Sequence, residues 1–239
     1  MHKQLLINGR KKSVYATEDP TRVVVQFKDI ATAFCGIKIA KIAGKGKINN
    51  AISSLLMAYL EEHGIHTVFL KKLSECEQLY LKVETIPIDI VLHNVFAGTL
   101  AKRLGVEEGQ PTKNVIVDVN LDSDELGNPM INDDQAVALG IVSLEELLFM
   151  KDVIRKANDL LKPLFASVGI VLVNFSLKFG RDSEGRIFIC DEITPDTCRL
   201  WDAKTNERLD KDRFCHDLGN VAEVYSDVLN RISVALKLQ

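Results

Sequence analysis

Apolar and polar residues alternate over positions 173–179, where the chain reads VNFSLKF. A period of two is typical of a β-strand that buries one face, and it leaves Asn174, Ser176 and Lys178 on the polar face. A second apolar run follows the turn-like segment RDSEG at 181–185. The pattern therefore predicts an antiparallel hairpin over residues 171–193.

Elsewhere the apolar residues recur at helical spacing. One stripe covers residues 48–60, with Gly64 placed to end the helix. A second stripe continues to Leu164 and follows Ser143 and Glu146, which have the spacing of a capping box. We expect a last helix over residues 217–236.

Strand-like segments occupy the first part of the chain, at 5–16 around a glycine turn, at 22–28 and at 66–73. Because strands and helices are segregated in places rather than strictly alternating, the predicted class is α+β with two lobes. We expect a smaller β-rich lobe at 1–85 and a larger α+β lobe at 86–239.

Composition narrows the function classes. With 46% hydrophobic and 26% charged residues, the 239-residue chain is an ordinary globular protein, and its net charge of -3 gives no general reason to bind nucleic acid. No run approaches the roughly 20 apolar residues of a membrane span, and the first residues do not look like a secretory signal. We therefore expect a cytoplasmic protein without a membrane partner. The five cysteines include no C-x-x-C pair, so free thiols are expected.

Common catalytic motifs are missing from the sequence. The segment GKGK at 44–47 lacks the earlier glycine of a phosphate-binding loop, and no G-x-G-x-x-G, G-x-S-x-G or H-E-x-x-H occurs. Two segments could bind anions. NGRKKS at 8–13 is either a phosphate-binding turn or an exposed basic hairpin, and HNVFAGTLAKR at 93–103 is either an anion site or a plain helix start.

Four segments together resemble one family. They are KGKINN at 45–50, FAGTLAKRLGVEEG at 96–109, DEITPDTCRLWD at 191–202 and LDKDRF at 209–214. The chain resembles the SAICAR synthetase family over nearly its whole length. The resemblance implies an ATP cleft between the two lobes, a homodimer, and ligation of L-aspartate to carboxyaminoimidazole ribonucleotide with ATP and Mg²⁺.

The resemblance also implies roles for single residues. Those implied for ATP are Gly9, Arg10, Lys12 and Lys82. Those implied for substrate binding are Thr99, Asp196, Arg199 and Arg213, of which Thr99 and Arg199 match residues that hold the ribonucleotide phosphate. Asp191, as the magnesium ligand, Arg199 and Lys211 are implied as catalytic.

Several positions depart from the family pattern. Asn174, Ser176 and Lys178 replace an aspartate, a lysine and a metal-binding glutamate, and Asp122 stands where a lysine is usual. The other altered site positions are Ile30, Cys35, His93, Asn128 and Cys215. Two unit charges about 4 Å apart interact by about 4 kcal/mol at an effective dielectric near 20, so a lysine in place of a metal ligand opposes a divalent ion by considerably more than thermal energy. We therefore expect impaired activity and doubtful Mg²⁺ binding. An inactive relative that keeps the scaffold and weak nucleotide binding is the alternative, and a kinase-like phosphotransferase is weakened by the absence of H-R-D and D-F-G motifs.

One structural prediction concerns the cation on the polar strand face. If the hairpin pairs as in the family, Lys178 and Asp191 share the cleft surface, and an unpaired acid there would be costly to desolvate. We predict that the Lys178 ammonium replaces the metal as the partner of Asp191. The alternative is that Lys178 extends into solvent.

Overall fold

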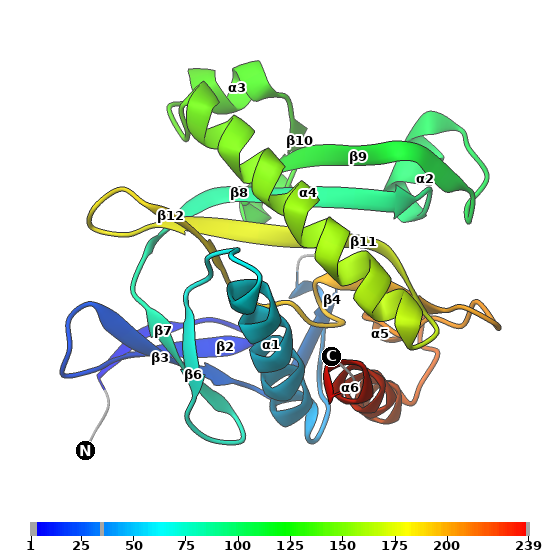
Figure 1. The fold of residues 1–239 in the computed structure, drawn as a ribbon, viewed down its shortest axis with the longest axis horizontal. Coiled ribbons are helices and arrows are strands. Elements are labelled where there is room, and N and C mark those ends of the chain that lie inside the picture. The colour runs from blue at the N-terminus through cyan, green and yellow to red at the C-terminus, as the bar shows by residue number, and fades with distance from the viewer. Residues whose placement is uncertain (1–3, 34–35, 238–239) are drawn as a thin grey trace.

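The computed structural model describes residues 4–33 and 36–237, and antiparallel strands form its two large sheets (Figure 1). The smaller sheet comes from the first part of the chain. Its strands, in order across the sheet, are β1 (Leu5–Asn8), β2 (Lys12–Ala16), β3 (Arg22–Phe27), β7 (Glu77–Leu81) and β6 (Phe69–Lys72). Val23, Val25 and Tyr80 belong to a buried cluster of this sheet.

The larger sheet contains the predicted hairpin. Its strands, in order, are β10 (Met130–Ile131), β9 (Pro111–Leu121), β8 (Glu84–Val95), β11 (Ile170–Arg181) and β12 (Ile187–Cys190), and β13 (Cys198–Asp202) also pairs with β11. Asn174 lies opposite His93 of β8 and opposite Arg199 of β13. Lys178 lies opposite Asp89 of β8. The register thus places the polar face of β11 beside polar residues of its neighbours.

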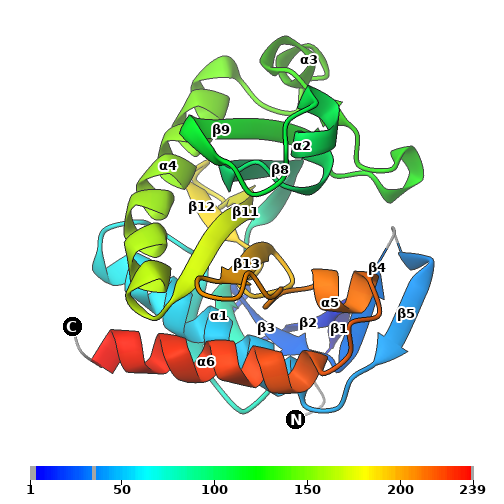
Figure 2. The ribbon, with the colours of Figure 1, turned by 90° about the vertical axis from the view of Figure 1, so that its right-hand side faces the viewer.

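Helices cover both sheets. α4 (Leu144–Ser167) crosses the larger sheet, and Leu147, Ile154 and Leu161 are buried beneath it (Figure 1). α2 (Gly98–Leu104) connects β8 to β9, and α3 (Asp133–Ala138) precedes α4. α1 (Lys45–Glu62) packs against the smaller sheet and against α6 (Val221–Lys237), which lies along it in Figure 2. The remaining elements are β4 (Ile30–Ala33), β5 (Lys38–Lys41), α5 (Asp212–Cys215) and a 3-10 turn at Asp124–Leu126.

The two sheets are joined through main-chain contacts. Val68 donates a hydrogen bond to the carbonyl oxygen of Ile189 over 2.9 Å, and Ile189 donates one to His66 over 3.1 Å. A single buried cluster runs from α1 through β8 and β11 to α4 and α6. The smaller sheet is therefore anchored to the strand that leads into the DEITPD segment. The boundary at residue 85 stays a prediction.

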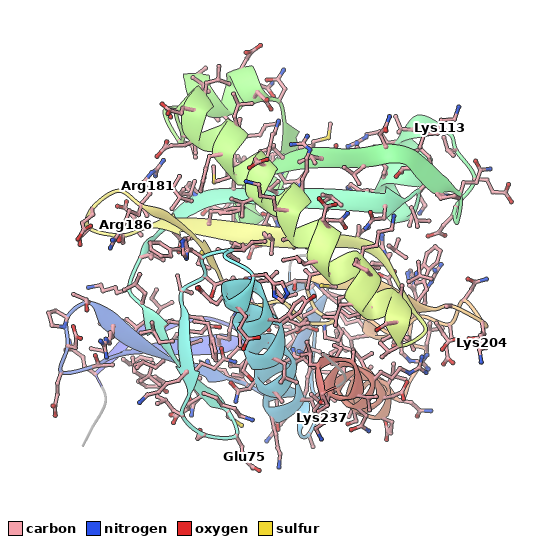
Figure 3. All side chains as sticks on the ribbon, viewed as in Figure 1. Glu75, Lys113, Arg181, Arg186, Lys204 and Lys237 are labelled. Carbon is pink, nitrogen blue, oxygen red and sulfur yellow. The ribbon has the colours of Figure 1, made fainter. Side chains whose placement is uncertain are left out.

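The structure confirms the periodic elements. The 173–179 alternation holds, since Val173, Phe175 and Leu177 are buried, and the hairpin turns at 182–186. Both bonds of the Ser143–Glu146 capping box are present. Glu146 also accepts a hydrogen bond from Arg181 over 2.6 Å at the hairpin tip, where Figure 3 also places Arg186, and this bond lowers the pKa of Glu146 to about 2.

Other elements differ from the predictions. β9 and β10 are strands that were not predicted from the sequence; β9 pairs with β8, and β10 pairs with β9. The last helix begins at Val221, after the separate short helix α5. Within residues 4–33 and 36–237, no helix is long and apolar enough to cross a membrane.

Candidate functional site

The turn between β1 and β2 carries three consecutive cations, Arg10, Lys11 and Lys12, after Gly9. The turn is tight, since a Cβ atom at position 9 would come within 3.0 Å of the Lys12 carbonyl oxygen. The Lys28 ammonium donates a hydrogen bond to the Gly9 carbonyl oxygen over 2.8 Å. The cations therefore lie on a fixed turn.

Lys11 and Lys12 face carboxylates of the segment that follows β12. The Lys12 ammonium pairs with Asp191 and lies 3.5 Å from Oε1 of Glu192, and the Lys11 ammonium lies 3.7 Å from the same oxygen. The Glu192 side chain is only 1% exposed. Burial alone would lower the pKa of Lys11, but neighbouring carboxylates, with Glu192 the strongest, outweigh it and raise that pKa.

The predicted ion pair between Lys178 and Asp191 is wrong, because each side chain has another partner. The Lys178 ammonium lies 2.5 Å from Oδ2 of Asp122, which follows β9 directly, and 3.9 Å from Oδ1 of Asp89. Asp191 has left the strand, with a left-handed φ of 71°, and its carboxylate meets Lys12. The alternative of a lysine extended into solvent is wrong as well.

The row across β8, β11 and β13 contains His93, Asn174 and Arg199. His93 is buried, and its Nε2 lies 3.4 Å from Oδ2 of Asp118. Arg103 donates to the same oxygen over 2.7 Å. Hydrogen bonds from His93 and Arg103 lower the pKa of Asp118. The altered position 93 thus has an acidic partner from β9.

Arg199 and the start of α2 form a second cationic place. Its guanidinium packs against Gly98, where φ is 54° and a Cβ atom would come within 2.6 Å of Nη1. Asp212 of α5 accepts hydrogen bonds from Nε over 2.8 Å and from Nη2 over 3.2 Å. Thr99, one residue into α2, is exposed. The Gly98 amide donates to Oε1 of Glu108, an exposed side chain, over 3.1 Å. We call Gly98, Thr99 and Arg199 the phosphate seat, because a backbone amide that already meets an acidic oxygen, a hydroxyl and a guanidinium are suitable donors for a phosphate.

Asp196 is buried and surrounded by protein donors. Its carboxylate pairs with Lys45, which is also buried, and accepts hydrogen bonds from Asn49 over 3.1 Å and from Tyr225 over 2.8 Å. Burial alone would raise the pKa of Asp196, but Lys45 outweighs it and the pKa is lowered. Lys45 and Asn49 join α1 to the DEITPD segment through Asp196, and Tyr225 joins α6 to it, so Asp196 has a structural role.

Arg213 also has protein partners. The guanidinium donates to Glu207 over 2.6 Å and to the carbonyl oxygens of Gly219 and Leu218 over 2.9 and 3.1 Å. Lys211 lies at the start of α5, where its amide donates to Pro195 over 2.9 Å. These contacts hold the chain around Asp212, the partner of Arg199.

Comparison with known proteins shows the family to which the chain belongs. A family model described as SAICAR synthetase matches residues 5–232. The chain belongs to the SAICAR synthetase family. It is 50% identical over 231 residues to phosphoribosylaminoimidazole-succinocarboxamide synthase of Clostridium acetobutylicum, covering 97% of this chain and 98% of that protein. The predicted family and α+β fold are thereby confirmed.

Two solved SAICAR synthetase structures have the same fold. One, from Ehrlichia chaffeensis, has a TM-score of 0.93 and 42% identity, with 96% of this chain and 98% of that chain covered. The other, a complex with ADP, has a TM-score of 0.92 and 42% identity, with coverages of 95% and 96%. The cytoplasmic location, the homodimer and the site roles stay predictions.

The remaining altered positions are scattered. Ile30 begins β4, and its carbonyl oxygen accepts a hydrogen bond from Lys45 over 3.4 Å. Asn128 has a φ of 53°, and its side chain accepts from the amide of Ser123 over 2.8 Å, which fixes the loop before β10. Cys215 is half-buried on α5. Cys35 lies outside the described residues.

The ATP positions are not all together. Arg10 reaches Asp124, beyond β9, over 3.1 Å. Lys82 is exposed after β7, and its amide donates to Thr21 over 2.8 Å. The structure therefore brings Arg10 and Lys12 toward the larger sheet and leaves the Lys82 side chain at the surface.

The donor set does not fit the magnesium ion that SAICAR synthetase membership implies. Mg²⁺ requires near-octahedral oxygen ligands at about 2.0–2.1 Å. Here Asp191 pairs with Lys12, and the other implied ligand position is Lys178. Among residues 4–33 and 36–237, no three His, Cys, Asp or Glu side chains are grouped to hold a metal.

Sequence reasoning missed several residues of this region. Lys11, Asp89 and Glu192 were not singled out, although Lys11 lies in the basic turn and Glu192 in the DEITPD segment. Lys45 lies in the KGKINN segment without a sequence signal for its partner. Asp89 gives no local signal, because it becomes significant only through its position opposite Lys178.

Proposed function

We propose that this protein binds ATP and carboxyaminoimidazole ribonucleotide and ligates L-aspartate to the ribonucleotide, more slowly than its relatives do. The observation that carries the proposal is the position of one segment, residues 191–202. Its first acids meet the cationic β1–β2 turn, and its Arg199 forms the phosphate seat. The proposed nucleotide site and the proposed ribonucleotide site therefore share one segment of the chain.

On the nucleotide side, the β1–β2 turn supplies the charge. Gly9 permits close approach of a phosphate to the backbone, and Arg10 and Lys12 stabilise the charge on the phosphate groups. A relative 42% identical to this chain is described in complex with ADP, which supports nucleotide binding here. Lys82, whose side chain is exposed, is the proposed ATP-binding residue at the surface.

On the ribonucleotide side, Arg199 holds the phosphate together with Thr99 and the amide of Gly98. Asp212 fixes the guanidinium, so little rotamer freedom is lost on binding. In such a ligation the ribonucleotide carboxylate becomes an acyl phosphate at the expense of ATP, and the amine of L-aspartate then displaces phosphate. Lys211 and Arg213 position α5 for this step. Asp196 contributes by holding residues 191–202 in place through its pair with Lys45.

The reduced rate follows from two altered places. His93 replaces an arginine of the family pattern and is already paired with Asp118, so the phosphate loses one charged donor. Lys178 puts a fixed positive charge among the acids that would otherwise hold a divalent ion. Losing a charged partner of this kind costs about 2 to 5 kcal/mol.

A steady-state assay of ADP release tests the proposal, with the Clostridium acetobutylicum relative as positive control. We expect release that depends on both L-aspartate and ribonucleotide, at least about 100-fold slower than in the control, for a barrier increase near 2.7 kcal/mol. A rate equal to that of the control would contradict the impairment. Absence of nucleotide and ribonucleotide binding would contradict the proposal as a whole.

A second candidate function is favoured by the Lys178–Asp122 contact. A relative that binds nucleotide without turnover would keep the scaffold and place a lysine where catalysis needs a metal. It would show a rise in melting temperature with ADP, through preferential binding to the folded state, and no ADP release under any condition. The same assay therefore separates the two candidates.

A further inference from the structure

Lys178 is held between acids from two neighbouring strands. Its ammonium lies 2.5 Å from Asp122 and 3.9 Å from Asp89, and all three side chains are roughly three-quarters buried, with exposures of 26%, 32% and 25%. Asp89 lies directly opposite Lys178 in the β8–β11 register. The contact is therefore built into the sheet rather than formed by a flexible surface chain.

The two acids need this cation. Burial raises the pKa of Asp89, Lys178 opposes that rise, and Asp122 adds to it. Both carboxylates lie within 4 Å of the same ammonium, so without it two acids would meet in one partly buried place with no cation between them. Lys178 thus performs for Asp89 and Asp122 the charge compensation that a bound ion gives to a cluster of acids.

The two acids after β12 are compensated in the same way. Asp191 has the ammonium of Lys12, and Glu192 has that of Lys11 at 3.7 Å. Each of the four carboxylates in this region consequently has a lysine ammonium within 4 Å. We call these seven residues the lysine–acid cluster: Lys11, Lys12, Asp89, Asp122, Lys178, Asp191 and Glu192.

A divalent ion would have to displace these ammoniums. It needs several oxygens free at once, whereas the Lys178 backbone is paired with β8 on one side and with β12 on the other, which holds its side chain beside these acids. We propose that Lys178 is a built-in cation that replaces the divalent ion of this cleft, so that the protein binds no Mg²⁺ or Mn²⁺ at the cluster. Nucleotide then binds with an affinity that does not depend on the metal, a corollary that rests on the proposed function.

The first test uses Mn²⁺ alone as the probe, followed by electron paramagnetic resonance with no nucleotide present. We expect no bound Mn²⁺ in the natural chain up to about 1 mM, and binding at least about tenfold tighter in Lys178→Glu, which would place three carboxylates together. Lys204→Glu makes the same charge change in the exposed loop after β13, which Figure 3 shows at the edge of the molecule, and should leave Mn²⁺ unbound.

Each result of the Mn²⁺ titration either supports or overturns the proposal. Mn²⁺ bound by the natural chain at sub-millimolar concentration would overturn the proposal, and so would equal gains in Lys178→Glu and Lys204→Glu. If Lys178→Glu does not fold, the natural chain still decides the question by its own titration.

The second test measures the Kd of ADP by calorimetry in excess Mg²⁺ and in EDTA. We expect the two values to agree within about threefold. A loss beyond about tenfold in EDTA would overturn the proposal and leave the proposed function intact. Absence of ADP binding in both buffers would overturn the proposed function and the corollary together, while the Mn²⁺ titration would still judge the built-in cation.

Discussion

The phosphate seat and the lysine–acid cluster both include residues of the larger sheet but differ in how their charges are arranged. In the seat, Arg199 is paired with Asp212 and its guanidinium lies beside Gly98, whose amide donates to the exposed Glu108 carboxylate over 3.1 Å. In the cluster, every acid is already paired with a lysine. An anion such as the ribonucleotide phosphate can therefore enter the seat, whereas the acids of the cluster are already neutralised by lysines of the protein. Ligand binding and catalytic turnover are thus separable properties of one fold.

The largest effect on stability should come from replacing Lys45, because its partner Asp196 is buried. Asp196 lies between the acids of the cluster and Arg199 of the seat along the chain. Lys45→Met leaves a buried carboxylate without its cation, which costs about 3–5 kcal/mol of unfolding free energy. Denaturant titration measures this loss. Lys47→Met, two residues along, breaks the exposed pair with Glu75 and should cost no more than about 1 kcal/mol. Equal losses in the two variants would contradict the structural role of the buried pair.

Arg199→Ala should sharpen the comparison by disabling the seat alone. Removing the guanidinium takes away the main cation for the phosphate and leaves Asp212 as a repelling charge. We expect ribonucleotide affinity to fall about 100-fold, within the 2–5 kcal/mol range for such pairs, with ADP affinity unchanged. Calorimetry with each ligand measures both. Arg186→Ala at the distant hairpin tip is the control, and a matching loss there would contradict the assignment.

His93→Arg combined with Cys215→Arg should strengthen the seat. Two added guanidiniums can form charge-assisted bonds to the phosphate, so we expect ribonucleotide to bind roughly 30-fold more tightly. Calorimetry against the natural chain checks the gain. No gain would show that these positions do not face the ribonucleotide phosphate, and that Asp118 retains the new arginine.

A smaller effect concerns pH near the seat. Asp210 accepts hydrogen bonds from the amides of Leu200 and Asp212, yet burial raises its pKa to about 7. The folded protein therefore holds a proton that the unfolded chain releases near pH 3.8, so this group adds stability as pH falls through 7. Lowering the pH from about 8 to about 6 should contribute about 1.4 kcal/mol. Denaturant titrations at both pH values give the change in unfolding free energy for the natural chain and for Asp210→Asn. The two changes should differ by that amount, and equal changes would contradict the raised pKa.

The sequence allowed the strand at 173–179, its polar face and the capped helix α4 to be predicted, because these depend on local periodicity. It did not allow the partner of Lys178 to be predicted. Asp122 follows β9 directly, and it reaches Lys178 only because β9 pairs with β8, which in turn pairs with β11. The turn of Asp191 out of the strand, at a φ of 71°, likewise has no signal in the residues around it.

The same distinction applies to charge. Replacement of an acid by Lys178 indicated a positive swing beside the metal position, but Asp122 stands where the family usually has a lysine, so the net charge of the pair is kept while the cation moves onto β11 beside Asp89. Only the contact between them shows this, since the residues are 56 positions apart. Charges read singly along a chain therefore overstate the disturbance that a folded site experiences.

A crystal structure with Mn²⁺ and ADP tests the built-in cation most directly, since anomalous scattering locates the metal. We predict that the Lys178 ammonium remains between Asp122 and Asp89, and that no anomalous peak lies within about 2.5 Å of the carboxylates of Asp191, Asp122 or Asp89. A manganese peak coordinated by Asp191, with Lys178 turned away from Asp122, would contradict the replacement of the metal by a lysine.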